Sequence, residues 1–420
     1  MNIKLLLAVT LLTAVSSADA FETEKEYGFI EAFQKGEVNV DGRLRYEDAD
    51  QEIQGAQALT LRSRLTFKTR EYNFLSAMIQ INDVTALPDD ENYNSGSNNQ
   101  GDDLLILDPE GTKVNQAWLV FDASNTRVKY GRQTVTMNNE RLIGSDPWRQ
   151  NEQTFTGLTV RNENYNLTRI YLGQLNSVQR VTGGEHQLGH NSLDAKYLNV
   201  EYRGIWLSKL SLYSVWLNEH DAQTQWESKT YGLRFSGELG GDSGINWGRE
   251  TGGDFSLDYQ FAYAHQEDAG DNVINYSAHY SLLELDAGFN KFHLKLGREL
   301  LGADEDGYFV TPLASLHEVQ GWTDQFSNSG LGNIPGGIRD VYLGLGYQCN
   351  ERYSVNAVYH QFKSDDNSNA LGLDDLGSEL GLEFKAELEH YRFILKYAKY
   401  DQDDFGVDTK RVWLSSEFMF

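Results

Sequence analysis

Apolar and polar residues take alternate positions along many short stretches of the chain. In residues 36–46, for example, Val40 and Leu44 stand between polar or charged neighbours, and residues 378–388 repeat the alternation around Leu382. Since successive side chains of a β-strand point to opposite faces, each stretch has one apolar and one polar face. About 9 to 11 such residues cross the hydrocarbon layer of a membrane. The pattern therefore predicts an all-β protein, a transmembrane antiparallel up-and-down β-barrel.

The connections between these stretches support the same fold. The turn at 69–72 is short, whereas the connections 84–111, 135–154 and 301–337 are long. Barrels of the outer membrane alternate short periplasmic turns with long extracellular loops. The Gly-rich stretch 240–254 falls where a short turn is expected and leaves room for a miscounted hairpin. We expect about 18 strands, at residues 36–46, 58–69, 73–83, 113–122, 126–134, 155–162, 166–174, 195–204, 208–218, 230–239, 255–265, 275–287, 291–300, 338–348, 352–363, 378–388, 391–401 and 410–420.

Composition fits a barrel better than hydropathy suggests. Mean hydropathy is −0.53, and no run beyond the N-terminus reaches the ~18 to 20 apolar residues of a membrane helix. A polar lumen face would dilute the hydropathy of every strand. The 23 Tyr, 20 Phe and 8 Trp, with only 5 Pro, suit strands and aromatic girdles. A soluble β-sandwich also alternates and is the competing fold.

Both ends of the chain resemble export and assembly signals. Lys4, the apolar stretch 5–14 and the small residues Ala18 and Ala20 predict a signal peptide at 1–20. The remainder, 21–420, is then one barrel domain. The last stretch ends at Phe420, which resembles the signal that the barrel-assembly machinery reads. We expect the protein in the outer membrane of a Gram-negative bacterium, in contact with lipid and lipopolysaccharide.

Charge and cysteine content narrow the partners. The net charge of −26 disfavours nucleic acid, because binding to phosphates needs the opposite balance. Cys349 is the single cysteine, so an internal disulfide is excluded in a compartment that would permit one.

Arginines recur on the polar phase of the expected strands. A guanidinium keeps its charge and forks onto carboxylates, so a row of arginines in the lumen would guide an anionic solute. The alternative is that these charges pair across strands with acidic residues of the same phase, such as Asp41, Asp258 and Glu417. The strand arginines that we expect to line the pore are Arg43, Arg45, Arg62, Arg64, Arg132, Arg161 and Arg169.

Two long connections have an unusual composition for free surface loops. Residues 135–154 combine arginines and amides with Trp148, and residues 301–337 are rich in apolar and aromatic side chains. We expect both to fold against the inner wall and to leave long extracellular loops partly inside the lumen. An ordered external loop is the alternative for the first. The side chains that we expect to line the constriction are Arg141, Arg149, Gln150, Asn151 and Gln153.

These connections resemble those of the alginate export family of outer-membrane porins. The motifs are G-R-Q at 131–133, N-E-R-x-I-G at 139–144, W-R-Q-N-E-Q-T-F at 148–155, T-P-L-A-x-L-H at 311–317 and G-W-T-D at 321–324. The resemblance implies an 18-stranded barrel with an electropositive lumen that passes a uronic-acid polymer. It also implies lumen arginines at Arg132, Arg141 and Arg149, and a second loop shaped by His317, Trp322 and Asp324. Thr156 departs from the acidic residue that the family pattern leads us to expect.

Acidic clusters occur in several expected loops. Carboxylate oxygens are ligands that Ca²⁺ accepts, and Asp304 and Asp306 are the candidate ligands for a structural calcium. None of the clusters matches a 12-residue EF-hand loop, so solvated loops are the favoured interpretation.

The sequence favours a porin for passive diffusion of an anionic solute, such as alginate or another uronate oligo- or polysaccharide. A porin for small organic acids without polysaccharide specificity is the alternative. We expect no catalytic residue and no cofactor, because neither a G-x-S-x-G elbow nor an H-E-x-x-H motif is present. An outer-membrane barrel hydrolase and a structural barrel with an occluded lumen are the remaining hypotheses.

Overall fold

The computed structural model describes residues 28–87, 92–97, 102–184, 186, 189–219, 226–240, 255–270, 272, 274–304, 307–327, 331–366 and 371–419. The expected signal peptide at 1–20, the stretch 241–254, Asp306 and Phe420 lie outside these residues. Among the residues described, no helix is both long enough and apolar enough to cross a membrane.

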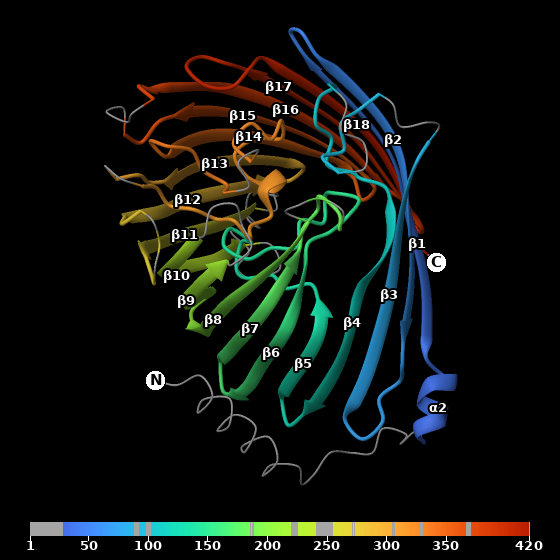
Figure 1. Cartoon of the computed structure of the whole chain (residues 1–420). Helices are drawn as coiled ribbons and strands as arrows, with labels where there is room; N and C mark the ends of the chain where they lie inside the picture. The colour runs from blue at the N-terminus through green and yellow to red at the C-terminus, as the bar shows by residue number, and fades with distance from the viewer. Residues whose placement is uncertain are drawn as a thin grey trace.

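The strands form one closed antiparallel sheet (Figure 1). Each strand pairs with the next along the chain, and β1 pairs with both β2 and β18, which closes the barrel. A short helix, α2 (Phe29–Gln34), precedes β1 and was not expected from the sequence. The strands are β1 (Glu37–Gln51), β2 (Gly55–Lys68), β3 (Leu75–Ala86), β4 (Gly111–Ala123), β5 (Thr126–Gln133), β6 (Thr154–Tyr165), β7 (Thr168–Gln179), β8 (His190–Ile205), β9 (Ser208–Glu219), β10 (Trp226–Gly240), β11 (Phe255–Asp268), β12 (Ser277–Phe289), β13 (Phe292–Leu301), β14 (Ile338–Asn350), β15 (Tyr353–Lys363), β16 (Asp375–Glu387), β17 (Tyr391–Asp401) and β18 (Thr409–Met419).

The 18-stranded sheet confirms the count expected from the sequence. β10 and β11 pair directly, up to Gly240 and Ser256, so no further strand separates them. Several strand ends were placed too early or too late, however. β1 continues to Gln51, because its pairing with β2 persists through Asp50 and Gly55 after the apolar alternation has ended.

Alternation along each strand separates a lipid-facing surface from the lumen. On β2, Leu65 is 49% exposed on the outside, whereas Arg62 on the opposite face is 6% exposed. On β4, Leu119 is likewise 60% exposed. An exposed apolar band around a polar interior is the arrangement that a barrel in a bilayer requires, and a soluble β-sandwich does not produce it.

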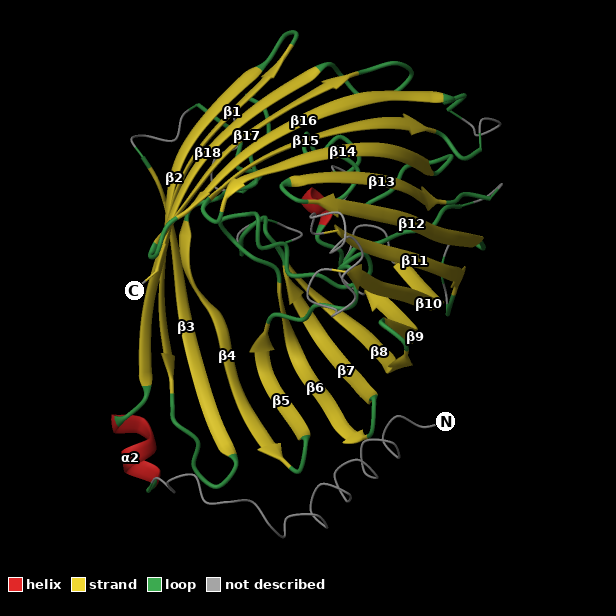
Figure 2. Cartoon of the chain, turned by 180° about the vertical axis from the view of Figure 1, so that it is seen from behind, coloured by secondary structure: helices red, strands yellow, loops and turns green. Residues whose placement is uncertain are grey.

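Loop segments lie inside the barrel (Figure 2), and described residues of three connections pack against its inner wall. From the connection between β3 and β4, Tyr93 and Ile106 pack on β1 and β2. Residues 134–153 meet the described residues of 302–337 in an apolar cluster that includes Ile143 and Phe309, both fully buried against inner-wall side chains. The loops expected inside the lumen are therefore found there.

A charge on the lipid-facing phase should destabilise the barrel. Leu65→Arg places a guanidinium in hydrocarbon and should lower the free energy of unfolding by about 2–4 kcal/mol near the bilayer midplane. Urea unfolding of the protein in lipid vesicles measures this change in the free energy of unfolding. The neighbouring Thr66→Arg, on the lumen phase, is the matched control and should cost much less; equal losses would contradict the assignment of faces.

Candidate functional site in the barrel lumen

The arginines of β1 hold the backbone of the inward-folded segment 134–153. Arg43 Nη1 donates to the carbonyl of Trp148 at 2.8 Å and to that of Pro147 at 3.0 Å. Arg45 Nη2 also donates to the Trp148 carbonyl, and Arg45 Nη1 lies 3.3 Å from an Asp108 carboxylate oxygen. A guanidinium carries five donors, so it can satisfy several loop carbonyls that have no strand partner. These two arginines therefore anchor the loop.

The amides next to Trp148 complete this anchor. Gln150 Nε2 donates to Thr60 Oγ1 on β2 at 2.9 Å. Asn151 Nδ2 donates to the Pro109 carbonyl at 3.0 Å, which joins the segment to the loop 87–110. Both amides are buried. Arg43, Arg45, Gln150 and Asn151 were expected to line the pore; the structure brings them together, with their polar atoms directed at other protein groups.

A chain of ion pairs connects β18 and β1 with the segments 134–153 and 302–337, which we call the inward segments. Arg411 Nη1 lies 2.6 Å from Glu47, and Arg149 Nη1 lies 3.2 Å from the other oxygen of the same carboxylate. Arg149 also pairs with Asp324 of the segment 302–337, and Asp324 lies 2.9 Å from His317 Nδ1. Buried charges need partners of this kind, because an isolated buried charge is strongly unfavourable.

The protonation of His317 follows from its two neighbours. Lys396 Nζ on β17 lies 3.2 Å from His317 Nε2, which must accept this hydrogen bond, so the ring proton sits on Nδ1 and is donated to Asp324. Burial lowers the pKa of His317 to about 3, in keeping with a neutral ring. Burial alone would raise the pKa of Asp324, but His317 and Arg149 outweigh it and hold that pKa below its ordinary value.

Lys396 is enclosed by aromatic rings from three parts of the chain. Its Nζ lies 4.0 Å from the centre of the Trp322 ring, 4.2 Å from that of Trp148 and 5.9 Å from that of Trp413. The His317 ring stacks on Trp148 with centres 4.7 Å apart. A desolvated ammonium over tryptophan faces is held by cation–π attraction. This lysine clamp joins both inward segments to the wall.

A group of basic side chains on β2 and β4 lies beside the arginines of β1. Arg62 pairs with Asp41 at 3.0 Å, and Arg64 lies 3.4 Å from Glu152. Arg64 and Lys113 lie in one row of the sheet, because both are opposite Asn82 of β3. Within the described part of the chain, Arg62 Nε, Arg64 Nη2 and Lys113 Nζ are buried donors without a hydrogen-bond acceptor.

The remaining expected arginines are elsewhere. Arg141 pairs with Glu299 of β13 at 3.2 Å and is buried on the far side of the lumen. Arg132 donates to the Val114 carbonyl of its own wall. Arg161 and Arg169 lie near the short turn between β6 and β7, where Glu163 is 3.7 Å and 2.6 Å away, respectively. Charge pairing, the alternative weighed from the sequence, thus accounts for most of the expected arginines.

The acidic loop residues serve as hydrogen-bond acceptors. Asp304 accepts from the Ser277 amide at 2.7 Å and from the Gly307 amide at 2.9 Å. In the described part of the chain, no group of three or more His, Cys, Asp or Glu side chains is arranged to hold a metal. A calcium at Asp304 and Asp306 therefore remains an expectation from the sequence.

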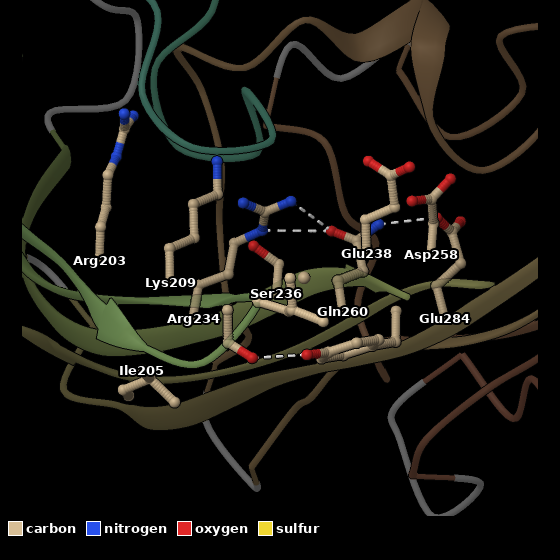
Figure 3. A pocket seen from close by; sticks show the side chains of 13 residues that line it. Arg203, Ile205, Lys209, Arg234, Ser236, Glu238, Asp258, Gln260 and Glu284 are labelled. Carbon is tan, nitrogen blue, oxygen red and sulfur yellow. Dashed lines mark hydrogen bonds between the residues drawn. The ribbon is translucent and has the colours of Figure 1, made fainter. Parts of the chain in front are cut away.

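Two cavities in the lumen lie along β8–β16. One cavity of about 540 Å³ is lined by Arg203, Lys209 and Arg234 on one side (Figure 3). A second, of about 610 Å³, shares Gln260 and Glu284 with it and continues along β13–β16. Arg203 and Lys209 were missed in the sequence, although they share the lumen phase of Glu201 and Ser211. Lys396 was missed because nothing local links a strand lysine to distant tryptophans.

A closed barrel with an apolar outer band and loops folded into its lumen defines an outer-membrane porin. Residues 34–295 match the alginate export family, described as "Alginate export". The chain belongs to that family, and its place is the bacterial outer membrane.

Solved porin structures share the fold at low sequence identity. Pseudomonas aeruginosa OccK3 (OpdO) aligns with a TM-score of 0.70 and 12% identity, covering 94% of this chain and 99% of that one. P. aeruginosa OpdK with vanillate aligns at 0.68 and 13%, covering 92% and 99%. Acinetobacter baumannii OccAB4 aligns at 0.68 and 13%, covering 92% and 98%. No curated protein sequence matches the chain.

Removing the ammonium of the lysine clamp should loosen both inward segments. Lys396→Met keeps a chain of similar length but loses the cation–π contacts, worth about 0.5–2 kcal/mol. We expect larger and noisier single-channel currents and faster proteolysis within 302–337. Lys399→Met, on the exposed outside of β17, is the control. Unchanged currents and proteolysis would show that the clamp does not hold the segments.

The buried neutral His317 should make stability depend on acid pH. Its pKa falls from 6.5 to about 3 on folding, so the unfolded chain binds the extra proton between these values and stability declines as pH falls through that window. The melting temperature of His317→Gln should therefore approach that of the wild type as pH drops from 7.5 to 4.5. The exposed His390→Gln is the control, and a constant difference for His317→Gln would refute the assignment.

Proposed function

We propose that the chain is a passive outer-membrane channel for small solutes that carry a carboxylate, namely organic acids or short uronate oligosaccharides. The observation that supports this proposal is the basic group of Arg62, Arg64 and Lys113. All three interact electrostatically with Glu152, and each keeps a buried nitrogen donor without an acceptor in the described part of the chain.

A basic group with too few partner carboxylates favours an anionic solute. Leaving a buried charged donor unpaired costs more than the ~1–3 kcal/mol of a neutral group. Two carboxylates, Asp41 and Glu152, partner three basic side chains here, so the group retains an excess positive charge. This excess charge would attract a solute carboxylate and then release it, as passage through a channel requires.

The size of two cavities in the lumen fits small solutes. Their volumes are about 540 and 610 Å³, which is the size range of small-molecule sites. Family membership supports a uronate unit, and vanillate, found with OpdK, is a small aromatic acid. No step of the proposed transport makes or breaks a covalent bond.

Neutralising the basic group should reduce anion preference. In planar bilayers under a salt gradient, we expect the wild type to favour anions and R64Q/K113Q to lose at least about five-fold in the anion-to-cation permeability ratio, corresponding to ~1 kcal/mol. Galacturonate and benzoate should reduce the wild-type chloride current and affect the variant less.

The control for this test is R70Q/K399Q, which removes one Arg and one Lys from exposed positions. Circular dichroism in detergent verifies that each variant keeps its sheet. Cation selectivity in the wild type, or an anion preference that R64Q/K113Q leaves unchanged, would overturn the proposal.

A further inference from the structure

The cavity of Figure 3 has a basic side and an acidic side. Arg203, Lys209 and Arg234 reach into it from β8, β9 and β10. Carboxylates line the other side, from β10, β11 and β12: Glu238, Asp258 and Glu284. The cavity therefore has positive charge toward β8–β10 and negative charge toward β10–β12.

The acidic side contains an unfavourable row of like charges. Glu238 lies directly opposite Asp258, and Asp258 lies directly opposite Asp286 on the next strand. Asp286 has His293 at 3.5 Å and Lys295 at 3.7 Å. For the side chains of Glu238 and Asp258, the described residues supply neither a hydrogen bond nor an ion pair. Like charges opposite each other destabilise a sheet, so a cationic group between them would relieve the repulsion.

The basic side retains capacity for an anion. Lys209 Nζ is 3.8 Å from Glu201, and its side chain is 42% exposed. Arg234 uses Nε and Nη2 on the side-chain oxygen of Gln260, at 3.1 and 2.7 Å, which leaves Nη1 for another acceptor. Arg203 pairs with Glu201 through Nε. A carboxylate in the cavity could accept hydrogen bonds from these donors.

The two sides are separated by the length of a short dipolar molecule. Lys209 is opposite Ser236, which is opposite Gln260, so two strand spacings, roughly 10 Å, separate the β9 and β11 backbones in this row. Asp258 is two residues from Gln260 on the same face. The side chains of both sides point into the cavity (Figure 3).

We propose that this cavity binds a small zwitterion, with its carboxylate toward Lys209 and Arg234 and its ammonium group toward Glu238 and Asp258. A plain anion gains only the first contact and is repelled by the acidic row. A plain cation gains only the second and is repelled by the basic side. The proposal goes beyond the carboxylate channel, because it assigns a selective site for a cationic group to the same lumen.

Three solutes of one chain length separate these cases. The full chain in a planar bilayer is exposed to 5-aminopentanoate, pentanoate or pentylammonium, and interruptions of the single-channel current are recorded. We expect 5-aminopentanoate to interrupt the current at about a five-fold lower concentration than either singly charged solute, which corresponds to ~1 kcal/mol.

Charge variants assign each end of the solute. E238Q/D258N should abolish the advantage of 5-aminopentanoate over pentanoate while leaving the response to pentanoate equal or stronger. K209Q/R234Q should abolish its advantage over pentylammonium. The matched control is E351Q/E389Q, which neutralises two exposed carboxylates in short turns outside the cavity and should retain the wild-type order.

The outcomes distinguish this proposal from the proposed function. Equal interruption by 5-aminopentanoate and pentanoate, or an advantage that survives E238Q/D258N, overturns the zwitterion site even if R64Q/K113Q alters anion selectivity. Conversely, a channel without anion preference that still discriminates the zwitterion would retain this site and remove the carboxylate-channel proposal.

Discussion

The structure depends on one constraint: inside the hydrocarbon layer, every backbone N–H and C=O must find its partner within the protein. An open sheet would leave two edges unpaired, and the pairing of β1 with both β2 and β18 removes them. Closure then fixes a second surface. Residues of one phase face lipid and those of the other face an enclosed space that is too wide for strand side chains to fill. The inward segments occupy much of that space.

The inward segments also need hydrogen-bond partners, because they bring backbone into the lumen that has no neighbouring strand. This is their own demand on the wall. Arg43 and Arg45 meet it by donating to carbonyls around Trp148. Arginine suits this role because its planar fork keeps its charge and presents several donors at once. The same charge must be balanced in a confined space, so Glu417 and Asp108 lie beside these arginines. The row of arginines that the sequence suggests as a path for the solute therefore serves in part to hold the loops of the constriction.

The sequence predicted the strands well because alternation is local: each strand reports its own two faces, whatever lies beside it. It predicted the inward loops from composition, since aromatic and amide side chains need a surface to pack on. The sequence could not predict which side chains pair with one another across the barrel. Arg411 and Glu47 are joined only after the last strand closes on the first, and Lys396 meets Trp148 only after a loop folds across the lumen. The strand ends beyond the membrane were misplaced because hydrogen bonding continues where apolar alternation stops.

The net charge of −26 says little about the solute, because the charges are sorted in space. In a ring of 18 strands, β3 and β12 stand on opposite walls. The wall at β2–β4 carries Arg62, Arg64 and Lys113, whereas the wall at β11–β16 carries Asp258, Glu284 and Glu383. Acidic loop residues such as Asp304 are meanwhile occupied with backbone amides. These charges contribute a field directed across the pore, which acts on the separation of a solute's charges as well as on their sum. A molecule with both signs of charge can align with that field, whereas a singly charged one is attracted to one wall and repelled by the other.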